Sequence, residues 1–369
     1  NYNPNDATKA TLVLDAPLKD FVYVAGSFNN WQPTAAYAMK KDATAGSTKF
    51  WLELTGLTAG TNYAYQYWVV DQTPLASSPS LVKAADPYST LVLSPYDDGG
   101  IPATSFPNLP AYPSGQEREV TWFKTGQTPY AWSQATLNFV KPAKEKLVVY
   151  EVLVRDFDAR RNFQDLIDKI DYFKNLKVNA IQLMPVMEFE GNESWGYNTS
   201  FHMALDKFYG TPEKLKELID LYHQNGIAVI LDVALNHAFG RNSMVRMWMN
   251  DPDGDGFGSP TTENPYFNTV AKHSYNVGED FNHQQARTKN YVKRVIKQWV
   301  EEFKIDGFRW DLTKGFTQNA QGSDAQTNAY QQDRVDVLKE YADYSWFLDP
   351  THYVIFEHLG TDAEERQWA

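Results

Sequence analysis

Three short segments of this chain share one pattern, an apolar run that ends in charged or polar residues. They are residues 229–237, 305–311 and 353–358. Continuous apolar runs of this length are typical of parallel strands buried on both faces. In a barrel of alternating strands and helices, the chemistry lies at the C-terminal ends of the strands. The pattern therefore predicts a parallel sheet with polar groups gathered at one edge.

Residues 147–369 alternate between strand and helix patterns, which predicts a parallel sheet with single crossovers. Thr211 and Pro212 suit the N-cap and the first position of one of the helices. The stretch 238–286 is too long for an ordinary connection, so we expect an elaborated functional loop there. Strands are expected at 147–154, 180–185, 227–235, 305–311 and 353–357, and helices at 163–176, from 211, at about 287–303 and around 330–346.

The sequence pattern of residues 1–95 predicts a separate all-β domain. Short β-branched or aromatic runs, separated by turn signals, favour a small antiparallel sandwich of the Ig-like type. Residues 96–146 are rich in Pro and Gly and are expected to form a linker or an extended wrap over the second domain. The predicted fold is thus an Ig-like β-sandwich followed by a (β/α)8 TIM barrel, of which about five strands are present in residues 147–369. The four clearest runs of the first domain are 11–14, 21–25, 50–54 and 62–70.

Composition and net charge restrict the kinds of partner that the chain can bind. The formal net charge of -12 argues against nucleic acid and anionic membranes, because both need a basic face, and no apolar run predicts a membrane span. The chain has no cysteine, which excludes disulfides and a thiolate nucleophile. The polar start is of the kind that follows signal removal, so we expect a secreted, periplasmic or cell-surface protein, with the cytoplasm left open.

Asp311 and Glu357 stand at the ends of two predicted strands. Glycosidic bond cleavage needs such a pair, because one carboxylate attacks or stabilises the anomeric carbon while a protonated one donates to the leaving oxygen. Arg309 lies two residues before Asp311 and points to the same face of its strand. Its guanidinium is expected to keep Asp311 ionised at neutral pH, although a plain barrel salt bridge is the alternative interpretation.

Several segments resemble signatures of the α-amylase family of glycoside hydrolases, family 13. The resemblance covers roughly 147–369 and implies a retaining double displacement through a covalent glycosyl-enzyme, with Asp311 as nucleophile, Glu357 as general acid and then base, and Arg309 beside them. It implies cleavage of α-1,4-glucosidic bonds in starch, glycogen or maltooligosaccharides, with no cofactor required for the chemistry. The matching segments are Asp232 with Asn236-His237, 307–311, Phe356-Glu357, Trp195-Gly196-Tyr197-Asn198 and Asp280-Phe281-Asn282-His283.

The same resemblance implies substrate contacts. His237 would hydrogen-bond the hydroxyls of the sugar being cleaved, Tyr197 would stack on its ring, and Asp232 would orient Arg309. Lys314 matches a lysine on the leaving-group side, although the histidine that usually follows it is Gly315 here. His358, directly after the acid, would contact the leaving-side sugar or none at all. For His237 and Tyr197 the alternatives are a hydrogen-bonded loop histidine and ordinary rim packing.

A second pattern predicts a structural Ca²⁺. Asp251, Asp253 and Asp255 alternate and are followed by glycine, like the opening of a calcium loop. The closing glutamate is absent, since Thr262 stands at the twelfth position, so a solvated Asp/Gly-rich turn is the alternative. In calcium-binding relatives the asparagine that matches Asn236 is also a ligand.

The first domain resembles carbohydrate-binding module 48, the starch- and glycogen-binding sandwich module found ahead of many such enzymes. The resemblance rests on Gly26-Ser27-Phe28-Asn29-Asn30-Trp31 and Asp86-Pro87-Tyr88. It implies that Trp31 stacks on glucose. A second tryptophan before Asp86 is missing, and Gln66 replaces an expected lysine, so a structural docking role stays open.

The family also needs a third carboxylate, an aspartate after the seventh strand, and a closed barrel takes about 250 residues. We therefore expect the chain to be part of a longer enzyme, inactive alone, whose partners are an α-glucan and the missing C-terminal part. The alternatives to an α-1,4 hydrolase are an α-1,6 debranching enzyme of the pullulanase or neopullulanase type, a branching enzyme and a non-catalytic glucan-binding protein.

Overall fold

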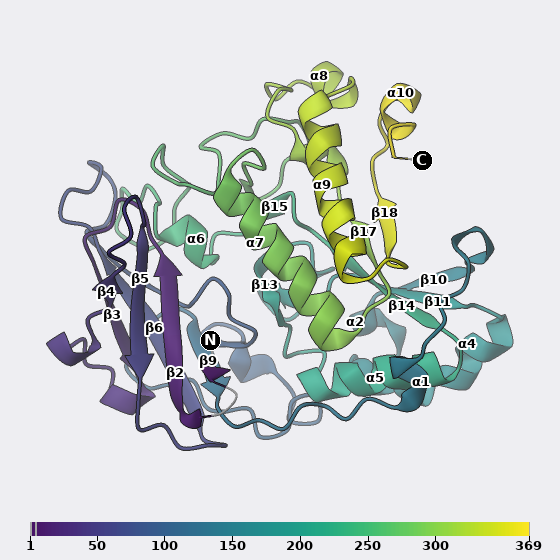
Figure 1. The fold of residues 1–369 in the computed structure, drawn as a ribbon, viewed down its shortest axis with the longest axis horizontal. Helices are drawn as coiled ribbons and strands as arrows, with labels where there is room; N and C mark the ends of the chain where they lie inside the picture. Colours follow the sequence, from purple (N-terminus) through teal and green to yellow (C-terminus); the bar gives the residue numbers. More distant parts are fainter. Residues whose placement is uncertain (1, 4–5, 369) are drawn as a thin grey trace. The chain divides into compact units, whose positions relative to one another are not determined.

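The computed structural model describes residues 2–3 and 6–368 (Figure 1). It divides into two compact units, and neither is a single stretch of chain. The first unit contains the residues up to Gly99, Pro110–Pro129 and Gly240–Pro265. The second unit contains Gly100–Leu109, Tyr130–Phe239 and the residues from Tyr266 onward.

The first unit contains two antiparallel sheets, in agreement with the all-β prediction, while the Ig-like class stays a prediction. Alternate residues of β5 are buried, as expected for a strand with one face on a core. One sheet has the order β1 (Tyr2–Asn3), β2 (Asp6–Asp15), β5 (Lys49–Leu54) and β4 (Lys40–Lys41). The other has the order β3 (Phe21–Gly26), β6 (Asn62–Val70), β9 (Val120–Lys124) and β8 (Val92–Leu93), with β7 (Leu81–Ala84) on β6.

The prediction of a linker over 96–146 is wrong in part. β9 lies within this stretch and pairs with both β6 and β8, so it is a strand of the second sheet. Its alternating Val120, Trp122 and Lys124 resemble the other strands, but the surrounding Pro and Gly obscure this pattern in the sequence. The rest of the stretch contributes the short helices η3 (Asp98–Gly100), α1 (Gln134–Leu137) and η4 (Lys144–Lys146).

The predicted functional loop 238–286 is also divided. Residues 240–265, with the short helix α6 (Ser243–Arg246), belong to the first unit. Backbone carbonyl groups of that unit hold them: Trp248 Nε1 donates to Pro17 O at 3.0 Å, and Arg246 Nη1 donates to Lys83 O at 2.9 Å. This half of the insertion therefore completes the first unit.

The second unit is built on a five-stranded parallel sheet. Its strands follow the chain order β10 (Val149–Val152), β11 (Ala180–Leu183), β14 (Ala228–Val233), β17 (Gly307–Trp310) and β18 (Tyr353–Phe356). β11 and β14 are buried along their whole length, which explains their unbroken apolar sequence. All five strands were predicted. The parallel register brings the ends of β14, β17 and β18 to the same edge.

Helices connect these strands. Thr211 caps α5 (Pro212–Gln224) as predicted, with its side chain accepting from Lys214 N at 3.1 Å. The predicted helix 163–176 is instead two helices, because Lys169 leaves helical geometry and caps the first of them. The other helices are α2 (Val154–Phe157), α3 (Phe163–Asp168), α4 (Ile170–Leu176), α7 (Ala286–Lys297) with the π-helical η5 (Gln298–Glu302), η6 (Thr313–Phe316), α8 (Asp324–Asn328), α9 (Gln332–Leu348) and α10 (Asp362–Glu365).

Helices α7 and α9 lie side by side (Figure 1), joined by ion pairs from Lys289 and Lys293 to Glu340. Two small strand pairs near the catalytic edge were not predicted: β12 (Met187–Phe189) with β13 (Thr199–Leu205), and β15 (His237–Ala238) with β16 (Glu279–Asp280). Among the described residues, no helix is both long and apolar enough to cross a membrane.

Candidate active site

One guanidinium joins three carboxylates at the C-terminal edge of the sheet. Arg309 Nη1 donates to Asp232 Oδ1 and Oδ2, both at 3.0 Å, and to Asp311 Oδ1 at 2.9 Å. Arg309 Nη2 lies 2.6 Å from Glu357 Oε1. The register explains the grouping, since Asp232 lies opposite Arg309 and Ile355 lies opposite Arg309 on the other side. The two predicted catalytic carboxylates therefore share one cation.

The turn after Asp311 holds Glu357. Leu312 N donates to Glu357 Oε2 at 3.0 Å, and Thr313 donates to the carbonyl oxygen of Glu357 from both its N and its Oγ1. Leu312 adopts a left-handed conformation with φ 41°, which is rare for a bulky residue and concentrates at functional sites. This turn aims a backbone donor at the carboxylate, a contact that residue type alone does not reveal.

Burial affects the pKa values of the carboxylates in this site more than Arg309 does. Burial raises the pKa of Asp311 to about 6, against the lowering effect of Arg309 and Asn236, and the charge of Glu357 adds to the rise. Burial likewise raises the pKa of Asp232 to about 7, although Arg309 and Tyr197 oppose it. Asp311 is therefore mostly ionised at neutral pH, but with a smaller margin than Arg309 alone would give.

His237, Asn236 and Tyr197 support this cluster. Tyr197 donates its hydroxyl to Asp232 Oδ2 at 2.8 Å, and Asn236 Nδ2 lies 3.3 Å from Asp311 Oδ2. The ring nitrogens of the buried His237 lie 2.6 Å from Tyr197 O and from Asn236 Oδ1. Burial lowers the pKa of His237 to about 4, so the neutral ring donates to one of these two oxygens. In this arrangement His237 faces protein groups on both sides.

Lys314 and His358 lie on the two segments that carry Asp311 and Glu357, the predicted catalytic pair. Lys314 Nζ donates to Asn328 Oδ1 at 2.7 Å and lies 5.5 Å from the Tyr275 ring. His358 is buried, with Nδ1 3.1 Å from Thr313 Oγ1 and Nε2 3.6 Å from Glu364 Oε2. Nδ1 of the imidazole therefore has a hydrogen-bond partner, whereas Nε2 lies near the Glu364 carboxylate with no hydrogen bond among the described residues.

Two residues that the sequence analysis did not identify hold the segments after Asp311 and Glu357 in place. Arg334 and Glu364 are wholly buried and form a two-pronged ion pair, at 2.6 Å on each side. Arg334 also donates to the carbonyl groups of Lys314, Thr327 and Ala329. The pair thus ties the residue after Glu357 to the residues after Asp311. No local motif marks either residue, because their partners come from distant segments.

The remaining predicted residues lie in the first unit. Trp31 follows η1 (Ser27–Asn29) in a left-handed conformation, with its N–H donating to Gly26 O. Gln66, which replaces an expected lysine, is buried and donates to Glu117 O and Glu119 O. Gln66 therefore holds the chain that leads into β9.

Carboxylate oxygens of Asp251, Asp253 and Asp255 lie within 4.8 Å of one another. Oxygen donors in this arrangement suit a hard cation such as Ca²⁺, and the buried Asp251 Oδ1 has no hydrogen-bond partner among the described residues. Asn236, the fourth predicted ligand, belongs to the second unit, where both ends of its amide are engaged by His237 and Asp311.

A pair of carboxylates bridged by arginine, at the C-terminal edge of a parallel sheet, is an arrangement suited to glycoside hydrolysis. Comparison with known proteins agrees with this class. Residues 156–255 match the model of the alpha-amylase catalytic domain. This match and the relatives below support an α-amylase-family catalytic domain in the chain.

Two curated relatives are malto-oligosyltrehalose trehalohydrolases. The protein from Saccharolobus solfataricus is 32% identical over 187 residues, covering 50% of this chain and 30% of the relative. The protein from Deinococcus radiodurans is 32% identical over 241 residues, covering 65% of this chain and 34% of the relative. The chain therefore spans about a third of the length of these relatives.

Among solved structures, the apo pullulanase from Paenibacillus barengoltzii matches with a TM-score of 0.69 and 19% identity. The match covers 100% of this chain and 55% of that one. At this identity the likeness concerns the fold, which both proteins share along the whole of this chain.

Proposed function

We propose that the second unit is the first part of the catalytic domain of a retaining α-glucan hydrolase that cleaves α-1,4 bonds. The observation that carries the proposal is the single guanidinium of Arg309 between Asp311 and Glu357. One cation placed between two carboxylates orients both toward a common space. Glu357 keeps a third of its side chain exposed, whereas Asp232 is wholly buried, so Glu357 can meet a substrate and Asp232 serves Arg309.

The chemistry follows from these positions. Asp311, ionised at neutral pH, attacks the anomeric carbon while Glu357 donates its proton to the departing glycosidic oxygen, which breaks the C–O bond. Glu357, now a carboxylate, takes a proton from water as the water attacks the same carbon, and the sugar leaves Asp311. Tyr197, His237, Lys314 and His358 are proposed to line the sugar on its two sides, directly or by holding their neighbours.

A second candidate is a hydrolase acting on malto-oligosyltrehalose. The 32% identity to two trehalohydrolases favours it. An α-1,6 debranching activity is the third, on the basis of the predicted front module and the Trp195–Asn198 segment. We propose the α-1,4 bond first because Lys314 follows the nucleophile at the position expected on the leaving-group side.

The test is product analysis with the full-length enzyme, because the chain spans only part of its relatives. Amylose, pullulan and malto-oligosyltrehalose are each incubated with enzyme and the products are sized. Short maltooligosaccharides from amylose support the proposal, and release of trehalose or selective cleavage of pullulan replaces it with one of the other two. Asp311→Asn should abolish turnover and leave glucan binding intact. Unchanged turnover in that variant would instead favour a non-catalytic glucan-binding protein.

Three further proposals accompany this one: α-glucan binding by the first unit through Trp31, a C-terminal part of the same enzyme that completes the barrel, and export of the protein. A Ca²⁺ site at Asp251, Asp253 and Asp255 is the fourth. Calcium titration followed by calorimetry should give one binding event that Asp253→Asn removes. An identical heat in that variant would show that the cluster is a solvated turn.

A further inference from the structure

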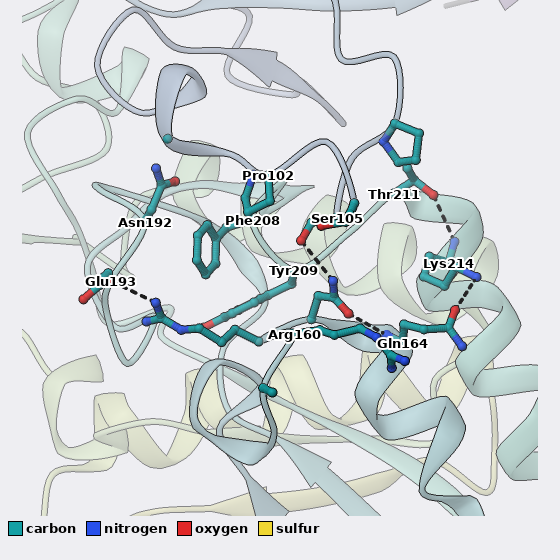
Figure 2. Close-up of a pocket in the computed structure, with 16 residues that line it drawn as sticks. Pro102, Ser105, Arg160, Gln164, Asn192, Glu193, Phe208, Tyr209, Thr211 and Lys214 are labelled. Atoms are coloured by element: carbon teal, nitrogen blue, oxygen red, sulfur yellow. Dashed lines mark hydrogen bonds and ion pairs between the residues drawn. The ribbon is translucent and has the colours of Figure 1, made fainter.

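The second unit contains a cavity of about 1030 Å³ that the catalytic residues do not line (Figure 2). Four segments surround it, at 100–107, 159–164, 192–193 and 208–214, all within this unit. Its volume is at the upper end of the range for small-ligand sites, about 300–1,000 Å³. The cavity is therefore large enough for two or more sugar rings.

The floor of the cavity is aromatic and carries an unpaired hydroxyl. Phe208 and Tyr209 pack edge to face, with ring centroids 6.2 Å apart, and Figure 2 shows both rings between the surrounding segments. Tyr209 is wholly buried, and its hydroxyl has no hydrogen-bond partner among the described residues. A buried hydroxyl without a partner is unfavourable, and a polar ligand group would supply the missing partner.

The charges around the cavity favour an uncharged ligand. Each of its three cations already pairs with a carboxylate, so the positive charge that would attract an anion such as phosphate is largely neutralised. Charge-paired guanidinium groups, carboxylates and amides still offer donors and acceptors to hydroxyl groups. The pairs are Arg161 with Glu193 at 3.0 Å, Arg160 with Asp165 at 3.2 Å and Asp168 at 2.5 Å, and Lys214 with Glu217 at 2.6 Å.

The cavity shares a loop with the catalytic edge. Glu193 stands between β12 and β13, in the loop that also carries Tyr197. This loop is held in place internally, since Gly196 N donates to Ser194 Oγ at 2.9 Å and Asn198 Nδ2 donates to Glu190 O at 2.6 Å. Gly196 itself has φ 95°, and a Cβ there would lie 2.4 Å from Pro185 O. A ligand that contacts Glu193 therefore contacts a fixed loop that also supports Tyr197.

We propose that this cavity is a second saccharide site, which binds an uncharged oligosaccharide segment of the α-glucan class. The neutralised polar rim suits the hydroxyls of a saccharide, and the Tyr209 hydroxyl beneath it has no hydrogen-bond partner among the described residues. The α-glucan class of the ligand rests on the proposed function. The existence of the site rests on the cavity, the Tyr209 hydroxyl and the paired charges.

The test uses the 369-residue chain with maltoheptaose. Hydrogen exchange read by mass spectrometry should show protection at 100–107 and 159–164 when the sugar is added. Ala159→Trp, which places a large ring at the exposed rim, should remove this protection, and Tyr209→Phe should weaken binding about tenfold. Tyr172→Phe, on the outer face of α4, is the matched control and should leave affinity unchanged. Thermal unfolding of each variant checks that it is folded.

Three outcomes overturn the proposal. One is protection confined to 309–315 and 356–360, with the same affinity in Ala159→Trp. Another is protection of the cavity segments by inorganic phosphate but not by maltoheptaose. The last is full affinity in a folded Tyr209→Phe variant. If the full-length enzyme fails to hydrolyse α-glucans while the cavity segments are still protected by maltoheptaose, the proposed function fails and the second site stands.

Discussion

The two edges of the parallel sheet both hold buried carboxylates, but they balance charge in opposite ways. At the N-terminal edge, Asp306 alone receives Val229 N at 2.7 Å and His223 Nε2 at 2.8 Å, with Lys141 Nζ 3.6 Å away. At the C-terminal edge, Arg309 is the cation that Asp232, Asp311 and Glu357 share, and each carboxylate also accepts from a neutral donor. One edge gathers several donors around one acid, and the other gathers three acids around one cation. We expect the first arrangement to stabilise the fold, and the second is the one that we propose for catalysis.

The largest expected effect comes from replacing one aspartate by asparagine at each edge and comparing the losses of turnover and of stability. In the full-length enzyme, Asp311→Asn should lower turnover by about 10⁴-fold, the scale for losing a triad member in other hydrolases, with little loss of stability. Asp306→Asn should instead cost about 1–3 kcal/mol of unfolding free energy, because buried donors lose their charged acceptor. Reducing-end assays and urea unfolding measure the two. Similar losses of turnover and of unfolding free energy in the two variants would contradict the contrast between the edges.

A second prediction concerns the buried ion pair of Arg334 and Glu364. This pair lies near the C-terminal edge, but we expect it to stabilise the fold, as the contacts of Asp306 do at the N-terminal edge. Glu364→Gln should destabilise the chain by about 3–5 kcal/mol, because it leaves the wholly buried Arg334 without its countercharge. Urea unfolding measures the loss. Asp362→Asn, whose partner is the exposed Arg366, is the control and should change stability by less than about 0.5 kcal/mol. An equally small loss of unfolding free energy in Glu364→Gln would show that this buried ion pair contributes no more than an exposed surface pair.

The third prediction follows from the pKa of Asp311, which burial raises to about 6 from an ordinary value of 3.8. The folded chain binds more protons than the unfolded chain between these values, so this group makes stability fall as pH rises from about 4 to about 6, by about 2–3 kcal/mol. The Asp311→Asn variant should lack this component. Urea unfolding at pH 4, 5, 6 and 7 checks it, and a variant with the wild-type slope would contradict it. Turnover should fall as pH drops through about 6, where Asp311, the proposed nucleophile, becomes protonated.

The smallest expected effect tests how closely the catalytic edge is packed. A Cβ at Gly315 would lie 2.9 Å from the Cβ of Asn236 and 3.1 Å from the His273 ring, so Gly315→Ala should push Asn236 away from Asp311. We expect turnover to fall about tenfold, since small displacements at a reacting centre are costly. Gly240→Ala, where a Cβ would meet no atom within 4 Å, is the control. Equal activity in both variants would show that Asn236 is free to move.

The sequence predicts the strands of the parallel sheet well, because their buried apolar runs are long and end in polar residues. It also places Asp311 and Glu357 at strand ends. It cannot predict that Leu312 N reaches Glu357, or that Arg334 pairs with Glu364, because both contacts depend on register and on segments distant in the chain. β9 was missed since its short pattern lies among prolines. The sequence predicts that Asp311 is ionised at neutral pH but not that burial raises its pKa, because charge spacing is visible in a sequence and burial is not.

The division of the chain has a consequence for synthesis and for engineering. The chain passes between the two units five times, at 99/100, 109/110, 129/130, 239/240 and 265/266. The first unit therefore lacks its last piece until Pro265 has left the ribosome, when much of the second unit has already emerged. No single cut separates the two units, because residues 240–265 of the first unit lie far along the chain. A swap of the front module at residue 95 or 146 would therefore leave the first unit without residues that complete it.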